Sequence, residues 1–141
     1  MGSSFARLRG PPRGRKAVLL APSAPMTAAT LALLIEQGAT FEHELALSDD
    51  SGTVVLTGYT ARMDIRPCPG STTLLHHLGT AEGGGIVIDG PAGVVQLRIP
   101  ASATREFGWE RAVYDLLLTS PDGDDTRLIE GPVTVKPGVT I

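Results

Sequence analysis

Residues 94–99 read VVQLRI, and apolar and polar side chains alternate along this stretch. One face of the extended chain carries Val95, Leu97 and Ile99, and the other carries Val94, Gln96 and Arg98. This period of two is typical of a strand that turns one face to a core and the other to water, as strands of antiparallel sheets do. We therefore predict a half-buried strand here.

Three further segments alternate in the same way: FEHELALS at 41–48, YTARMDIR at 59–66 and AVYDLLLT at 112–119. Their predicted inward faces are Phe41, His43, Leu45 and Leu47; Tyr59, Ala61, Met63 and Ile65; and Ala112, Tyr114, Leu116 and Leu118. Shorter strands are expected at 31–36, 53–56, 73–78, 85–89, 126–130 and 132–135. A single helical turn is expected at 101–107, after Pro100.

The composition agrees with this pattern. The chain has 141 residues, 42% of them hydrophobic and only 4% aromatic, so the core must be mainly Leu, Val and Ile. Its 17 Gly and 11 Pro indicate many turns and few long helices. About eight short strands at this spacing predict an all-β fold, an antiparallel immunoglobulin-like β-sandwich, with a closed barrel as the alternative.

Charge is distributed unevenly along the chain. Residues 1–25 carry five basic side chains, no acidic ones and four prolines, and we expect them to be a flexible, disordered arm ahead of a sandwich domain at 26–141. Translation could equally start at Met26. The domain has seven basic and fifteen acidic residues, a net charge of −8, which disfavours contact with nucleic acid. The sequence predicts no secretory signal and no membrane span.

The sequence contains no motif that predicts catalytic, cofactor-binding or metal-binding residues. Adjacent strand residues such as His76 and His77 point to opposite faces and do not suit one metal ion. His43 is interpreted as a core or rim histidine, and Cys68, between two prolines, as a bystander thiol. The carboxylates Asp122, Asp124 and Asp125 lack EF-hand spacing and fit a polar hairpin loop. We therefore expect a protein that is not an enzyme and has no cofactor.

Three segments together resemble a known family. They are TVVLTGYTARMDIR at 53–66, LLHHLGTAEGGGIVIDGPAGVVQLRIP at 74–100 and YDLLLTSPDGDDTRLIEGPVTV at 114–135. Their order is similar to that of small virion proteins of tailed bacteriophages and prophages, in particular the immunoglobulin-like N-terminal domain of phage upper baseplate proteins. The resemblance spans roughly residues 31–138 and carries no catalytic residues.

The resemblance implies a non-catalytic structural component of a phage particle, at the tail or baseplate, the connector or the head surface. Its expected location is the virion, assembled in the bacterial cytoplasm, and its expected partners are other virion proteins and copies of itself. The alternative hypothesis is a carbohydrate- or host-receptor-binding module. Sugar platforms need exposed aromatic rings, and Trp109, beside Phe107, is the only ready candidate.

Overall fold

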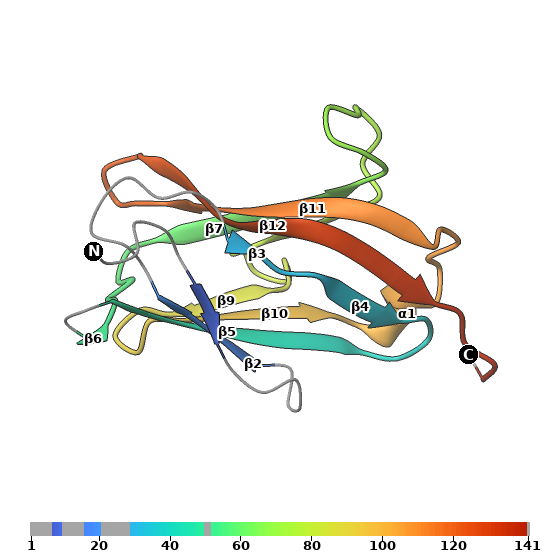
Figure 1. Cartoon of the computed structure of the whole chain (residues 1–141), viewed down its shortest axis with the longest axis horizontal. Helices are drawn as coiled ribbons and strands as arrows, with labels where there is room; N and C mark the ends of the chain where they lie inside the picture. The colour runs from blue at the N-terminus through green and yellow to red at the C-terminus, as the bar shows by residue number, and fades with distance from the viewer. Residues whose placement is uncertain (1–6, 10–15, 21–28, 50–51, 141) are drawn as a thin grey trace.

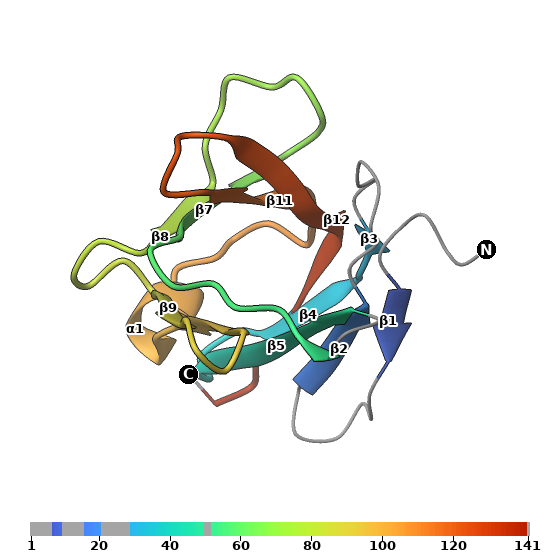
Figure 2. The ribbon, with the colours of Figure 1, turned by 90° about the vertical axis from the view of Figure 1, so that its left-hand side faces the viewer.

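The computed structural model describes residues 7–9, 16–20, 29–49 and 52–140 of the chain. Two β-sheets face each other as the layers of a sandwich (Figure 1), and the view turned by 90° separates the layers (Figure 2). Figure 1 places β7, β11 and β12 in the upper layer and β5, β9 and β10 in the lower one. The predicted all-β sandwich is thereby confirmed.

The described strands divide between two sheets. The first sheet has the order β1 (Arg7–Arg9), β2 (Lys16–Leu20), β5 (Phe41–Asp49), β10 (Val94–Ile99) and β9 (Ile86–Asp89), with β6 (Gly52–Thr53) beside β5. The second has β3 (Ala29–Thr30) and β4 (Leu33–Glu36) beside β12 (Asp125–Lys136), followed by β11 (Arg111–Thr119), β7 (Thr60–Arg66) and β8 (His76–Gly79). One short helix, α1 (Ala101–Thr104), follows Pro100.

The core lies between the sheets and is built from the alternating faces. The inward side chains of β10 and β11 are buried, and the residues between them are exposed or half-buried. Strand β7 follows the same phase, with Ala61, Met63 and Ile65 buried. The strand phases predicted from period-two alternation are therefore correct. Two predicted inward residues are only partly buried: His43, within β5, and Tyr59, just before β7.

A tyrosine ties the first strands of the second sheet to its centre. The Tyr114 hydroxyl donates a hydrogen bond of 2.7 Å to the backbone oxygen of Leu31, between β3 and β4. The ring is buried while its polar end is satisfied by the backbone. Next to this contact, a Cβ on Gly131 would lie 2.5 Å from the same Leu31 oxygen, so the close approach of the two backbones requires glycine there.

Strand β12 differs from its prediction. Two strands were expected at 126–130 and 132–135, but one strand of 12 residues runs through both and continues across Pro132. Its register with β11 shifts between Leu116 and Leu117, which leaves Leu128 as an extra residue. The bulge places two consecutive residues, Leu128 and Ile129, in the core, which a strict period of two does not allow.

The sheets are mixed, whereas antiparallel sheets were expected. Strands β3 and β4 pair with β12 in parallel, and β2 pairs with β5 in parallel. All three parallel pairs lie on one side of the sandwich, next to β5 and β12, and the other described pairs are antiparallel. Alternation along one strand carries no information on the direction of its neighbour, so the sequence could not reveal this.

The basic arm contains two strands that were not expected. Residues 16–20 lie in register with residues 44–48 of β5, and β1 pairs with β2 in turn. Residues 1–6, 10–15 and 21–28 lie outside the described part of the chain, and the proposed domain boundary at residue 26 stays a prediction. Of residues 1–25, the structure describes these two short strands alone.

This pairing makes truncation at Met26 informative. The sequence-based expectation is an unchanged melting temperature, but loss of β2 removes a row of backbone hydrogen bonds from β5, each contributing about 0.5–1.5 kcal/mol net. We therefore expect a drop of about 4 °C or more by calorimetry. A chain that starts at Lys16 keeps β2 and is the control. Identical melting of all three chains would show that β2 adds nothing to stability.

Candidate functional site

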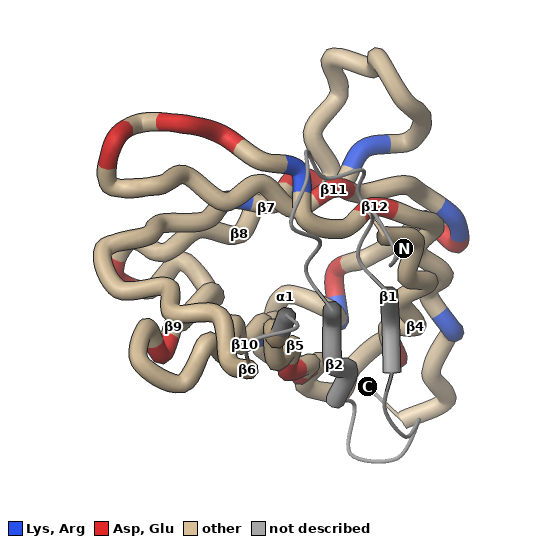
Figure 3. The backbone as a smooth tube through the Cα atoms, turned by 60° about the vertical axis from the view of Figure 1, so that its left-hand side comes forward, with Lys and Arg blue, Asp and Glu red and all other residues tan. Residues whose placement is uncertain are grey.

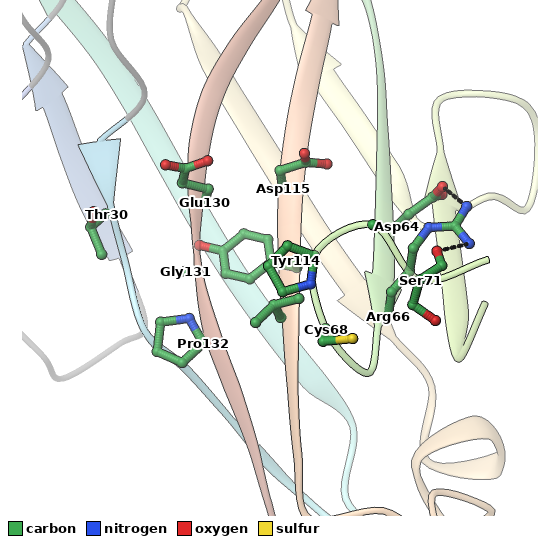
Figure 4. Close-up of a pocket in the computed structure, with 13 residues that line it drawn as sticks. Thr30, Asp64, Arg66, Cys68, Ser71, Tyr114, Asp115, Glu130, Gly131 and Pro132 are labelled. Carbon is green, nitrogen blue, oxygen red and sulfur yellow. Dashed lines mark hydrogen bonds and ion pairs between the residues drawn. The ribbon is translucent and has the colours of Figure 1, made fainter. Parts of the chain in front are cut away.

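A row of charged residues crosses the outer face of the second sheet. Asp64 on β7, Asp115 on β11 and Glu130 on β12 lie directly opposite one another in register. The row continues to His77 on β8 and to Thr30 on β3. Figure 4 shows the three carboxylates on neighbouring strands, and Tyr114, next to Asp115 in the chain, is buried. We call these five residues the carboxylate row.

Asp64 is the best-connected member of the row. One of its oxygens lies 2.6 Å from His77 Nδ1, and the other accepts a hydrogen bond of 2.8 Å from Arg66. Arg66 also donates to the backbone oxygen of Ser71, which ties the 67–75 loop to the sheet. Burial acts to raise the pKa of the Asp64 carboxyl, but the hydrogen bonds from His77 and Arg66 together outweigh it and hold that pKa below its usual value.

The neighbouring charges are also paired across strands. Arg127 donates to Asp115 at 3.0 Å, and Arg62 bonds to Asp125 at 3.3 Å. A hydrogen bond of 2.6 Å from Thr119, followed by the contact with Arg62, lowers the pKa of the Asp125 carboxyl. Each pair is partly exposed, so the network adds little to stability and mainly presents alternating charges to solvent.

The row borders a shallow depression of about 700 Å³. Its wall is formed by the loop after β7, including Cys68 and Ser71, and by the Gly131–Pro132 segment of β12. A second depression of about 730 Å³ lies on the outer face of the first sheet, between β5, β10 and the loop at 80–85. Acidic residues occur on strands of both sheets (Figure 3). Charged side chains line both depressions, such as Glu130 in the first and Glu44 in the second.

The described residues include no group of three His, Cys, Asp or Glu side chains that could hold a metal ion. They also include no helix that is long and apolar enough to cross a membrane. The carboxylate row can offer oriented hydrogen-bond acceptors and donors to a charged or polar partner surface. When a partner surface carries complementary charges, such contacts set orientation and specificity more than affinity.

The histidine pair separates as the strand geometry requires. The His76 ring meets Phe107 edge-on at 5.3 Å, whereas His77 bonds to Asp64 on the outer face. Burial, together with the neighbouring His77, lowers the pKa of His76. The prediction that adjacent strand residues point to opposite faces agrees with these separate partners.

The other sequence candidates have structural contacts. His43 stacks on Phe41 with ring centroids 6.3 Å apart, and Cys68 is exposed. Asp124 belongs to the 120–125 hairpin, where the Ser120 amide donates to its carbonyl oxygen. Trp109 packs against Phe107 with ring centroids 5.0 Å apart and is half-buried.

Sequence reasoning missed the carboxylate row. The alternation in β7 and β11 does place Asp64 and Asp115 on outward faces, which was a usable signal. The register that sets Asp64 opposite both Asp115 and His77 joins strands distant in sequence, and no pattern within one segment encodes it.

The Asp64 contacts predict a pH-dependent contribution to stability. Because the carboxyl pKa is lower in the folded chain than its ordinary 3.8, the stabilisation is present above that value and is lost as the pH falls through the folded-state pKa. We expect Asp64→Asn to cost about 1 kcal/mol at pH 7 and to show a much smaller difference near pH 2 in denaturant titrations. Asp122→Asn, in the exposed hairpin, is the control, and a cost that is the same at both pH values would contradict the electrostatic origin.

The sandwich geometry defines the class of protein: a mostly-β fold of two packed sheets. The sequence matches no protein-family model and no curated protein. Among solved structures, the bradyzoite-specific antigen BSR4 of Toxoplasma gondii is 9% identical with a TM-score of 0.41, covering 94% of this chain and 52% of the antigen chain. Extracellular domains 3–5 of Drosophila OTK are 14% identical with a TM-score of 0.36, covering 82% of this chain and 37% of theirs. These distant likenesses concern the fold alone.

Proposed function

We propose that this chain is a non-catalytic structural subunit that works by assembling with copies of itself and with neighbouring proteins, in the particle of a tailed bacteriophage. The observation that carries the assembly role is the open strand edge on each side of the sandwich. Among the described pairings, β9 bonds only to β10, and β4 only to β12. Each open edge offers unpaired backbone groups to a partner strand.

Both edges also expose an apolar side chain. Val87 on β9 is 62% exposed and Leu34 on β4 is 51% exposed. Because β9 and β4 lie on opposite sides of the sandwich, one copy can contact a neighbour on each side, which suits rings and stacked layers. Weak contacts are sufficient when many copies act together. The setting in a phage particle rests on the resemblance of residues 31–138 to virion proteins.

A substitution on the β9 edge tests assembly directly. Lysine on an edge strand opposes pairing with another strand, so Val87→Lys should lower the oligomer mass that light scattering measures. Val139→Lys is the matched control, because Val139 is fully exposed and lies after the last strand. Equal masses for both variants and the unaltered chain would show that the β9 edge is not used.

The location in a particle needs a second experiment. Mass spectrometry of purified particles should detect the protein, and particles made without its gene should be defective in assembly. Normal, infectious particles without the protein would overturn the structural role. Particles that assemble but do not adsorb would instead favour the alternative of receptor binding, and the isolated domain should then bind host cells.

A further inference from the structure

The β5 edge is completed by a strand from the basic arm. Strand β10 pairs with β5 on one side over residues 41–46. On the other side, β2 lies parallel to β5, with each of residues 16–20 opposite one of residues 44–48. Without β2, this part of β5 would present an unpaired edge about five residues long. The structure therefore contains both an acceptor edge and a donor strand that fits it.

The donor strand is a separable part of the chain. The pairings that the structure describes for β1 and β2 connect them to the sandwich through β5. Residues 21–28 join β2 to β3, and a segment of that length can extend by about 28 Å. It contains Pro22 and Pro25, and proline fixes its own φ and favours an extended backbone in the residue before it. Eight residues are therefore long enough, by chain length alone, for β2 to lie on a second copy.

Charge favours the same pairing between arm and domain. Lys16, at the start of β2, lies directly opposite Glu44 of β5. The arm carries five basic and no acidic residues, whereas residues 26–141 have a net charge of −8. Arms of one copy are therefore attracted to the domain of another, and this attraction acts over distances of about 10 Å at ordinary salt.

We propose that β2 of one copy pairs with the β5 edge of a second copy, so that the arm is the element that links subunits. The exchanged arrangement reuses the hydrogen bonds of the arrangement within one chain, so its main cost is the entropy of association. That cost falls when subunits are held close together, and in this respect the inference rests on the proposed assembly function. The occupant of the β5 edge is a second copy of this chain.

Disulfide cross-linking between differently labelled chains tests the exchange. Val18 and Ala46 lie opposite each other in register, at the spacing of neighbouring strands, about 4.8 Å, which suits a disulfide. Val18→Cys and Ala46→Cys are made as separate full-length proteins, both with Cys68→Ser, and one is labelled with ¹⁵N. They are mixed, concentrated and oxidised. Gln96→Cys on β10, one strand further from β2, replaces Ala46→Cys in the control mixture.

The expected result is a disulfide between residues 18 and 46 of different chains, at least tenfold more abundant than the link to residue 96. A protein that carries both Val18→Cys and Ala46→Cys reports whether β2 reaches β5 at all. If that protein closes only within one chain and the mixture gives no excess link, arm exchange is overturned. Light scattering of the unaltered chain distinguishes failure of arm exchange from failure of the assembly function. Oligomers without the 18–46 link overturn arm exchange alone. A monomer at all concentrations overturns both arm exchange and the assembly function.

Discussion

Replacing Leu97 by aspartate should unfold the domain or reduce its free energy of unfolding by about 4 kcal/mol or more. Leu97 is 1% exposed at the centre of β10, and the substitution removes a packed side chain and places a carboxylate among apolar groups without a partner. The free energy of unfolding of natural domains is only about 5–15 kcal/mol, so this change removes a large part of it. Urea titration followed by circular dichroism measures the effect.

The adjacent position supplies the control. Arg98 faces solvent and forms a partly exposed ion pair of 3.5 Å with Glu42 on β5. Arg98→Asp loses this pair and sets two acidic residues opposite each other, a change worth about 1 kcal/mol or less at an exposed site. Similar losses from the two substitutions would mean that the inward and outward faces of β10 are assigned the wrong way round.

Replacing Gly85 by alanine should be the second large effect, with a loss of about 3 kcal/mol. Gly85 has φ of +92°, and a Cβ there would lie 2.6 Å from the backbone oxygen of Arg98 and 2.3 Å from the buried Leu78 side chain. Its backbone also bridges to Gly79, between the loop at 80–85 and the end of β8. A methyl group would push β10 away from this junction, which adds overpacking to backbone strain.

Gly123 is the control for the cost of placing alanine at a positive φ. It has φ of +94° in the exposed 120–125 hairpin, where a Cβ would meet no atom within 4 Å. Gly123→Ala should therefore cost only the strain of a left-handed residue, about 1–2 kcal/mol. The difference between the two alanine variants in thermal unfolding measures the close approach itself. No difference would show that the loop at 80–85 moves to accommodate the methyl group.

Several features of the fold could be read from single segments. The phases of β7, β10 and β11 followed from alternation, because each strand buries one face and burial selects apolar side chains at every second position. The inward Tyr114 with its hydroxyl on a backbone oxygen was also foreseeable, since a buried phenol needs an acceptor. The separate partners of His76 and His77 followed from strand geometry in the same way.

Other features depended on contacts between distant segments. Three features depend on the register between strands: the parallel pairing of β2 with β5, the bulge at Leu128, and the carboxylate row. Register is decided by how whole faces pack and by which edges remain open, and these quantities do not exist within one segment. Alternation within single segments was enough to locate β5, β7, β10 and β11 and to identify the side chains that they bury. Which strands are neighbours depends on the packing of the complete sandwich, because strand pairing joins segments that are far apart in the sequence.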